Sequence, residues 1–275
     1  MTAPFRPDAR PAGPSWIAPV DLASWPRTEQ EALAEQLRLR PRVEPHGPAL
    51  APGSLVAGVD VAYDDERDTV AAAAVLLDLG TLEVVEESTA VGRIAFPYVP
   101  GLLAFREVPA VVDALAGLSR RPDLVVCDGY GLAHPRRLGL ASHLGVLTGL
   151  RTLGVAKTPF TFTCQPPGPE RGAWTPLLDE QSEEEVGRAL RTRAGVKPVF
   201  VSVGHRIGPS EAVDCVLALT PRYRLPETTR RADSLCRRAL GALGAPGSVA
   251  AVGSVGVVAD SDAGGTAGVG QGDWS

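Results

Sequence analysis

Three acidic residues stand alone in apolar surroundings, a pattern that is typical of metal-binding sites. Asp60 interrupts the apolar run 55–63. Asp128 ends the apolar run 124–127, and Glu107 follows a short apolar stretch of helical character. Because a buried carboxylate without a partner is costly, each acid needs a cation, an arginine or several backbone donors. Oxygen ligands alone suit Mg²⁺ or Mn²⁺ better than zinc. The acids therefore predict a divalent-cation site, with structural ion pairs or helix caps as the alternative.

An aromatic residue and two glycines accompany these acids. Tyr98 lies within Pro97-Tyr98-Val99-Pro100, and the two prolines restrict the backbone so that the ring is held in one position. Such a ring can wedge into a base stack, or it can simply pack on the core. Gly129 and Gly131 flank Tyr130 directly after Asp128. Glycine lets a backbone approach a ligand closely, although the same residues are also common in turns.

Other polar residues have weaker signals. Lys157 ends an expected strand, where it can stabilise charge on a phosphate or simply face solvent. His134 is as readily a structural histidine as a functional one, and for His143 the structural interpretation is favoured. Asp233 lies among arginines in the last expected helix, where an exposed ion pair is the commoner role.

Composition excludes several classes of protein. The chain has 275 residues, of which 44% are hydrophobic and 21% charged, as in globular proteins. It has no apolar segment approaching the roughly 20 residues that span a bilayer, and its N-terminus lacks the apolar core of a secretory signal. The four cysteines have neither zinc-site nor disulfide-framework spacing. We therefore expect a cytoplasmic protein with no membrane partner.

The net charge of −5 is unevenly distributed along the chain. Residues 91–160 carry 8 basic and 4 acidic side chains, and residues 191–240 carry 10 and 4. Most of the suspected motifs lie in these same segments. A local basic excess of this kind is the electrostatic footprint of a phosphate-rich partner, although solvated helix faces can also produce it.

The expected elements form two halves. Residues 55–63, 69–78 and 82–89 are β-rich with short connections, which predicts three antiparallel strands. Strands at 124–128 and 152–157 with a helix at 138–150 between them predict parallel pairing. A further strand is expected at 198–204, and further helices at 109–119, 209–219 and 228–240, with a break at Val108-Pro109 beside Glu107. By analogy, this α/β pattern of a mixed sheet flanked by helices is that of the ribonuclease-H-like fold.

Composition also divides the chain into three parts. Residues 1–25 are rich in Pro and Ala, and we expect a poorly ordered N-terminal extension. A capping box, Thr28 with Glu31, predicts a helix directly after it. We expect the functional domain to span residues 26–240. The Gly/Ala/Val-rich composition of residues 241–275 predicts a flexible tail.

Six motifs in this order resemble the endonuclease V family, the deoxyinosine-directed repair nucleases. They are VAGVDVAY, FPYVPGLLAFRE, PDLVVCDGYGLAHPRRLGLASHLG, GVAK, the Gly-His at 204–205 and LPETTRRAD. The likeness covers about residues 26–238, and its two central motifs are long and specific.

The resemblance implies a role for individual residues. It places metal-binding acids at Asp60, Glu107 and Asp128, a wedge tyrosine at Tyr98, a catalytic lysine at Lys157 and His134 near the scissile phosphate. Asp233 occupies a position that is histidine in some members, and either residue can serve a metal centre. The likeness also implies that the hypoxanthine pocket and its surroundings include Pro97, Val99, Pro100, Gly101, Leu103, Gly129, Gly131, Gly139, Leu140 and His205.

The implied activity is Mg²⁺-dependent hydrolysis of the second phosphodiester bond 3′ to a deaminated base in DNA, by a monomeric enzyme in which Mn²⁺ can replace Mg²⁺. Hypoxanthine leaves the base stack cheaply because its pairing is already weak. Three alternatives remain open: an endoribonuclease for inosine-containing RNA, a modified-base reader without catalysis, and a glycosylase that needs no metal.

Overall fold

The computed structural model describes residues 16–51 and 53–243. Residues 1–15 and 244–275, which include most of the expected extension and nearly all of the expected tail, lie outside the described residues. The elements are α1 (Glu29–Leu39), η1 (Arg40–Arg42), β1 (Leu55–Asp64), β2 (Thr69–Asp78), β3 (Val84–Arg93), α2 (Leu103–Ala116), β4 (Leu124–Asp128), α3 (Leu140–Thr148), β5 (Thr152–Ala156), β6 (Trp174–Leu178), β7 (Glu185–Leu190), β8 (Val199–His205), α4 (Pro209–Ala218) and α5 (Glu227–Leu243). None of the described helices is long and apolar enough to cross a membrane.

The described strands form one eight-stranded mixed sheet in the order β3-β2-β1-β4-β5-β8-β7-β6. The three antiparallel strands are confirmed as β1–β3, and β1, β4 and β5 run parallel to one another. This arrangement confirms the mixed sheet expected of the ribonuclease-H-like fold. The strand expected at 198–204 is present as β8, and it pairs antiparallel with β5.

The hairpin of β6 and β7 was not predicted from the sequence. Pro176 lies inside β6 and cannot donate to a ladder, so the segment does not resemble a strand. Because β6 is the edge strand, it tolerates this proline. Arg137 ties the hairpin back to the loop after β4 through ion pairs with Asp179 (2.7 Å) and Glu184 (2.9 Å).

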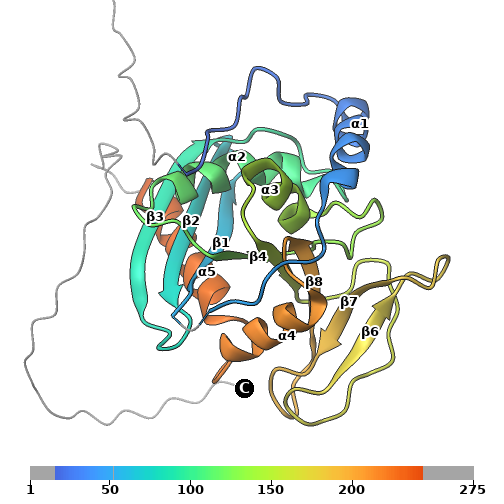
Figure 1. The fold of residues 1–275 in the computed structure, drawn as a ribbon. Coiled ribbons are helices and arrows are strands. Elements are labelled where there is room, and N and C mark those ends of the chain that lie inside the picture. The colour runs from blue at the N-terminus through green and yellow to red at the C-terminus, as the bar shows by residue number, and fades with distance from the viewer. Residues whose placement is uncertain (1–15, 52, 244–275) are drawn as a thin grey trace, which may run out of the picture.

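Helices cover both faces of the sheet (Figure 1). The helices α2 and α3 pack on one face, where residues such as Val59 and Cys127 join Val108 and Leu144 in one apolar cluster. The helices α4 and α5 pack on the opposite face, α4 over β8 and α5 over β1 and β2. The central strands are buried on both sides, which explains their nearly continuous apolar sequences.

The expected break beside Glu107 is wrong, because α2 continues through Pro109. A proline inside a helix lacks the N–H that would bond to the carbonyl four residues earlier, here that of Phe105. The indole N–H of Trp25 donates to this carbonyl instead (Nε1 to O, 2.9 Å). Glu107 therefore lies within a continuous helix, two residues before Pro109.

Residues 16–25 lie against the folded core, although the sequence assigned them to the extension. Ile17 is 7% exposed, and Trp16 and Trp25 pack against the cluster under α2. The predicted capping box at Thr28 is present, with Glu31 N–H donating to the hydroxyl of Thr28 and the carboxylate of Glu31 accepting from the backbone N–H of Thr28. It starts α1 directly after this packed segment.

Candidate active site

Two of the predicted acids lie on neighbouring strands of the central sheet. In the parallel pair of β1 and β4, Val59 is in register with Cys127, and the next residues along the two strands are Asp60 and Asp128. Asp60 is half-buried, and its Oδ1 accepts from the N–H of Val61 (2.8 Å). The acids thus meet where β4 ends, at the edge at which α/β sheets place their sites.

The acids Asp60, Asp128 and Glu107, here called the carboxylate cluster, are half-buried or buried and close to one another, so their negative charges are unfavourable without a cation. Burial raises the pKa of Asp60 to about 7, and the nearby negative charges of Asp128 and Asp233 add to the effect. Burial likewise raises the pKa of Glu107 to about 8, with further contributions from Asp60 and Asp128. Acids that repel one another inside a low-dielectric site are stabilised in their charged forms by a bound cation.

Glu107 reaches this cluster from α2. Its side chain is 8% exposed, and the hydroxyl of Tyr63 donates to its Oε1 (3.0 Å). This hydrogen bond opposes the upward shift in the pKa of Glu107. The guanidinium of Arg106 lies over the ring of Tyr63 at 4.2 Å from its centroid. Tyr63 therefore orients Glu107 from the strand that also bears Asp60.

Lys157 and Asp233 approach the same acids. The Nζ of Lys157 lies 2.5 Å from Oδ2 of Asp128. Burial lowers the pKa of Lys157, but the hydrogen bond and the charge of Asp128 outweigh burial, and the pKa is raised. Asp233, on α5, pairs with Arg237 at 2.8 Å. Its charge still acts on Asp60, so the fold brings the predicted fourth acid to the edge of the cluster.

The donor set fits a hard divalent cation only if other oxygens complete the coordination. Among the residues that the structure describes, no three His, Cys, Asp or Glu side chains form a group that could hold a metal by themselves. Mg²⁺ usually binds through one or two carboxylates together with water and substrate phosphate. Asp60 and Asp128, adjacent on β1 and β4, provide such a pair.

A pocket of about 190 Å³ lies beside the acids. Its lining includes seven of the predicted substrate-binding residues, His134 and five others: Gln36, Tyr98, Val99, Pro100, Gly101, Leu103, Ala104, Tyr130, His134, Leu138, Gly139, Leu140 and Phe160. Tyr98 is 67% exposed at this pocket, although large aromatic side chains are more often buried. Leu103 and Glu107 are four residues apart on α2, so the pocket and the acids are separated by about 6 Å along one helix.

His134 serves as a wall of this pocket. Its Nδ1 accepts from the backbone N–H of Arg136 (3.2 Å), which leaves Nε2 to donate to the carbonyl of Gly101 (2.9 Å). Burial, reinforced by the charge of Arg136, lowers the pKa of His134 to about 4. Both ring nitrogens are occupied by hydrogen bonds within the protein, and the place near the scissile phosphate that the family resemblance implies for His134 stays a prediction.

Other predicted residues lie outside the pocket lining. The N–H of Gly131 donates to Oγ of Ser202 (2.8 Å), and a Cβ at Gly131 would lie 2.0 Å from the carbonyl oxygen of Val203. Gly131 is therefore required by packing against β8. Pro97 and Gly129 are sequence neighbours of residues in the lining but do not belong to it.

His205 was predicted to bind substrate, but its position in the fold does not place it at the pocket. It lies at the end of β8, 5% exposed, and its Nδ1 accepts from the N–H of Glu44 (3.1 Å). It holds the segment after α1 against the sheet and does not line the pocket.

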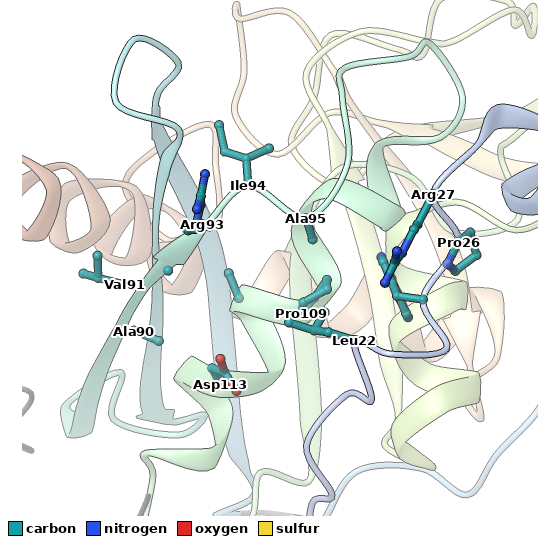
Figure 2. A pocket seen from close by; sticks show the side chains of 13 residues that line it. Leu22, Pro26, Arg27, Ala90, Val91, Arg93, Ile94, Ala95, Pro109 and Asp113 are labelled. Carbon is teal, nitrogen blue, oxygen red and sulfur yellow. The ribbon is translucent and has the colours of Figure 1, made fainter. Parts of the chain in front are cut away.

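A larger hollow of about 390 Å³ lies apart from these acids (Figure 2). Its walls come from residues 22–27, from β3 and the residues after it, and from the face of α2 that bears Pro109 and Asp113. None of the predicted site residues lines it, so the smaller pocket is the candidate substrate site.

The family model described as Endonuclease V matches residues 31–234. The chain belongs to the endonuclease V family. It is 69% identical over 219 residues to the endonuclease V of Streptomyces coelicolor, covering 79% of this chain and 93% of that protein.

Solved structures of the endonuclease V family have the same fold. The crystal structure of endonuclease V from Streptomyces avermitilis superposes with a TM-score of 0.78 at 65% identity, covering 81% of this chain and 97% of that one. Endonuclease V from Ciona intestinalis, solved with a 24mer DNA containing an inosine followed by a ribo-adenosine, superposes with a TM-score of 0.69 at 27% identity, covering 78% and 98%. The protein is accordingly a nuclease.

Two residues of this endonuclease V fold that contact the pocket region were missed by the sequence reasoning. Gln36 is fully buried on α1, and Arg136 reaches it and the carbonyl of Gly101. A signal for Gln36 was present, because it shares the buried face of α1 with Ala32 and Leu39. A polar residue at a core position of an amphipathic helix requires internal partners.

Proposed function

We propose that this endonuclease V cuts DNA containing deoxyinosine, hydrolysing the second phosphodiester bond 3′ to the lesion. One observation supports this most directly: the first two turns of α2 carry both Glu107, which joins the acids, and Leu103, which lines the small pocket beside the exposed Tyr98. A pocket of about 190 Å³ is below the roughly 300–1,000 Å³ typical of drug-sized ligands, and it suits a single base. The Ciona relative, solved with inosine-containing DNA, supports the same substrate class.

Recognition would begin with extrusion of the base. Tyr98 is exposed between two prolines, which favours its entry into the stack in place of the displaced nucleotide. The base would then lie between the turn at residues 98–101 and the segment at 138–140. Tyr130 and Phe160, which meet edge to face at 5.3 Å, offer aromatic surface at the same pocket.

Hydrolysis would take place at the acids. We assign Mg²⁺ to Asp60 and Asp128 together with water and substrate phosphate, and we propose that Glu107 and Asp233 join this site when the cation is bound; Mn²⁺ has the same oxygen preference. The cation would activate water and neutralise charge on the phosphate. Lys157 would place a second positive charge beside Asp128, where it can stabilise the developing phosphate charge.

A nicking assay tests this proposal. Duplexes with a single deoxyinosine should be nicked in Mg²⁺, with the break mapping to the second bond 3′, while chelator or a guanine in place of inosine should abolish cleavage. Cleavage of inosine-containing RNA alone would instead identify an endoribonuclease. Binding without cleavage would identify a reader, and an abasic product formed in chelator would identify a glycosylase.

The cellular setting is part of the same proposal. The four cysteines are all free, and Cys127, Cys215 and Cys236 are buried, as expected in the reducing cytoplasm. We propose a monomeric cytoplasmic enzyme whose catalytic domain corresponds to residues 26–240.

A further inference from the structure

Gln36 connects the two walls of the candidate base pocket, and neither the sequence motifs nor the family likeness assigned it a role. Its side chain is fully buried. One N–H of its amide donates to the carbonyl of Gly101 (3.0 Å), and the other donates to the carbonyl of Leu138 (3.1 Å). Its Oε1 accepts from Nε of Arg136. Every hydrogen-bonding group of this amide is therefore used within the protein, apart from one remaining lone pair on Oε1.

The Gly101 wall is a tight turn that follows Tyr98. The N–H of Leu102 donates to the carbonyl of Val99 (2.9 Å), and Pro100 and Gly101 occupy the central positions. Gly101 has φ of +80°, which matches the third position of a type II turn. Proline at the second position and glycine at the third are the residues that this turn favours.

The carbonyl of Gly101 is held by three donors. They are Nε2 of Gln36 (3.0 Å), Nε2 of His134 (2.9 Å) and Nη2 of Arg136 (2.8 Å). A carbonyl oxygen has two lone pairs, so this one has no capacity left to accept from a base. The N–H on the other side of the same peptide is bonded to Val99. The turn is therefore fixed in place rather than free to adapt.

The three donors differ in what they connect. His134 and Arg136 belong to the loop after β4, which ends at Leu138 and Gly139, so they link the turn to the loop that contains the opposite wall. Gln36 comes from α1 and bonds simultaneously to Gly101 and to Leu138. Leu138 adjoins Gly139 and Leu140 in the opposite wall. Gln36 is therefore the donor that bonds directly to both walls, and it does so from a separate element, α1.

We propose that Gln36 is a specificity-determining positioning residue, which keeps the base pocket at one width so that it accepts hypoxanthine and rejects guanine. These two bases differ by one exocyclic amino group, and rejection by a steric clash works only if the walls do not yield. The inference rests on the proposed function of the pocket. Gln36 acts through the walls and does not reach the acids around Asp60.

The test compares three variants with the wild type. Gln36→Leu removes both donors at similar size, and Gln36→Glu keeps the shape but places a carboxylate against two carbonyls. Gln30→Leu, an exposed position on the same helix, is the matched control. For each, we would measure affinity for a deoxyinosine duplex in chelator, the single-turnover nicking rate at saturating enzyme in Mg²⁺, and the ratio of deoxyinosine to deoxyguanosine cleavage.

Both Gln36 variants should bind the deoxyinosine duplex about tenfold or more weakly and lose about tenfold of their preference over guanine. Their saturating nicking rate on deoxyinosine should stay within about threefold of wild type, because the acids are untouched. If Gln36→Leu fails to fold, Gln36→Glu decides, with circular dichroism as the check on folding.

If a folded Gln36 variant keeps its affinity for the deoxyinosine duplex and its preference over deoxyguanosine, the inference about Gln36 is wrong, while the proposed function stands. The same holds if the variant loses only its saturating nicking rate. A wild-type enzyme with no preference for deoxyinosine would instead refute the proposed function, and this inference with it. Gln30→Leu should match the wild type in all three measurements.

Discussion

The indole of Trp25 donates to the carbonyl of Phe105, the acceptor that Pro109 leaves without a helical partner. This single hydrogen bond joins the segment before α1 to the helix that holds Glu107. It also supplies that carbonyl with a donor in place of the N–H that Pro109 lacks, within a helix that continues past the proline.

Replacing Trp25 by Phe should therefore weaken both stability and catalysis. The variant leaves a carbonyl without a donor, which costs about 1–3 kcal/mol. It also releases α2 next to Glu107, so nicking should fall several-fold. Urea unfolding and single-turnover nicking measure the two effects.

Trp16→Phe is a matched control for that experiment. The indole N–H of Trp16 is buried and has no hydrogen-bond partner among the described residues, so its removal should be neutral or stabilising. Equal destabilisation by both substitutions would show that ring size, rather than the bond to Phe105, is what matters.

Asp128→Asn should abolish nicking while preserving recognition. The substitution removes the partner of Lys157 and one of the two carboxylates proposed to hold Mg²⁺. The cation contributes several kcal/mol to such a reaction, so the rate should fall by about a thousandfold or more. Affinity for the deoxyinosine duplex in chelator should change little. The exposed Asp214→Asn on α4 is the control, and near-normal nicking by Asp128→Asn would refute the assigned site.

The two lysines of the chain provide an internal comparison. Lys157 contacts Asp128, whereas Lys197 is exposed between β7 and β8. Lys157→Met should lower the saturating nicking rate by about 100- to 1,000-fold, the range seen when a donor to developing charge is lost. Lys197→Met should leave that rate unchanged. Similar small effects from both would indicate that Lys157 serves only the general electrostatic attraction of DNA.

Buried histidines should make stability depend on pH on the acid side. Burial lowers the pKa of His143 and of His134 to about 4, from an ordinary value of 6.5. The unfolded chain then binds more protons between these two values, so stability should fall as pH decreases from about 6.5 to about 4. Each histidine can contribute up to about 3 kcal/mol over this window.

His143→Phe should flatten part of this pH dependence. The His143 ring is fully buried beside Trp25 and Phe105, and neither of its nitrogens has a hydrogen-bond partner in the described structure. A phenyl ring fits such an apolar setting and cannot be protonated. Urea midpoints at pH 7 and pH 4.5 measure the difference, with exposed His46→Gln as the control. An unchanged midpoint difference in His143→Phe would contradict the assignment.

The sequence by itself determined the local elements and the chemistry of the site. Alternating and continuous apolar runs predicted β1–β5 and β8, and the isolation of Asp60 and Asp128 in such runs predicted acids at a sheet edge. These signals are local, because a few neighbouring residues are enough to show strand periodicity and to show that a carboxylate lies among apolar side chains, where its burial is costly.

Only the tertiary structure decided which distant groups complete the local pattern. Trp25, which bonds to the carbonyl that Pro109 leaves without a helical donor, lies 80 residues from Phe105 in the chain. Gln36, which bonds to both pocket walls, lies 65 residues from Gly101 and 102 from Leu138. The antiparallel direction of β8 and the hairpin of β6 and β7 are likewise long-range pairings. A hydrogen bond between such distant segments forms only after the chain has folded, so no local pattern of residues in the sequence predicts it.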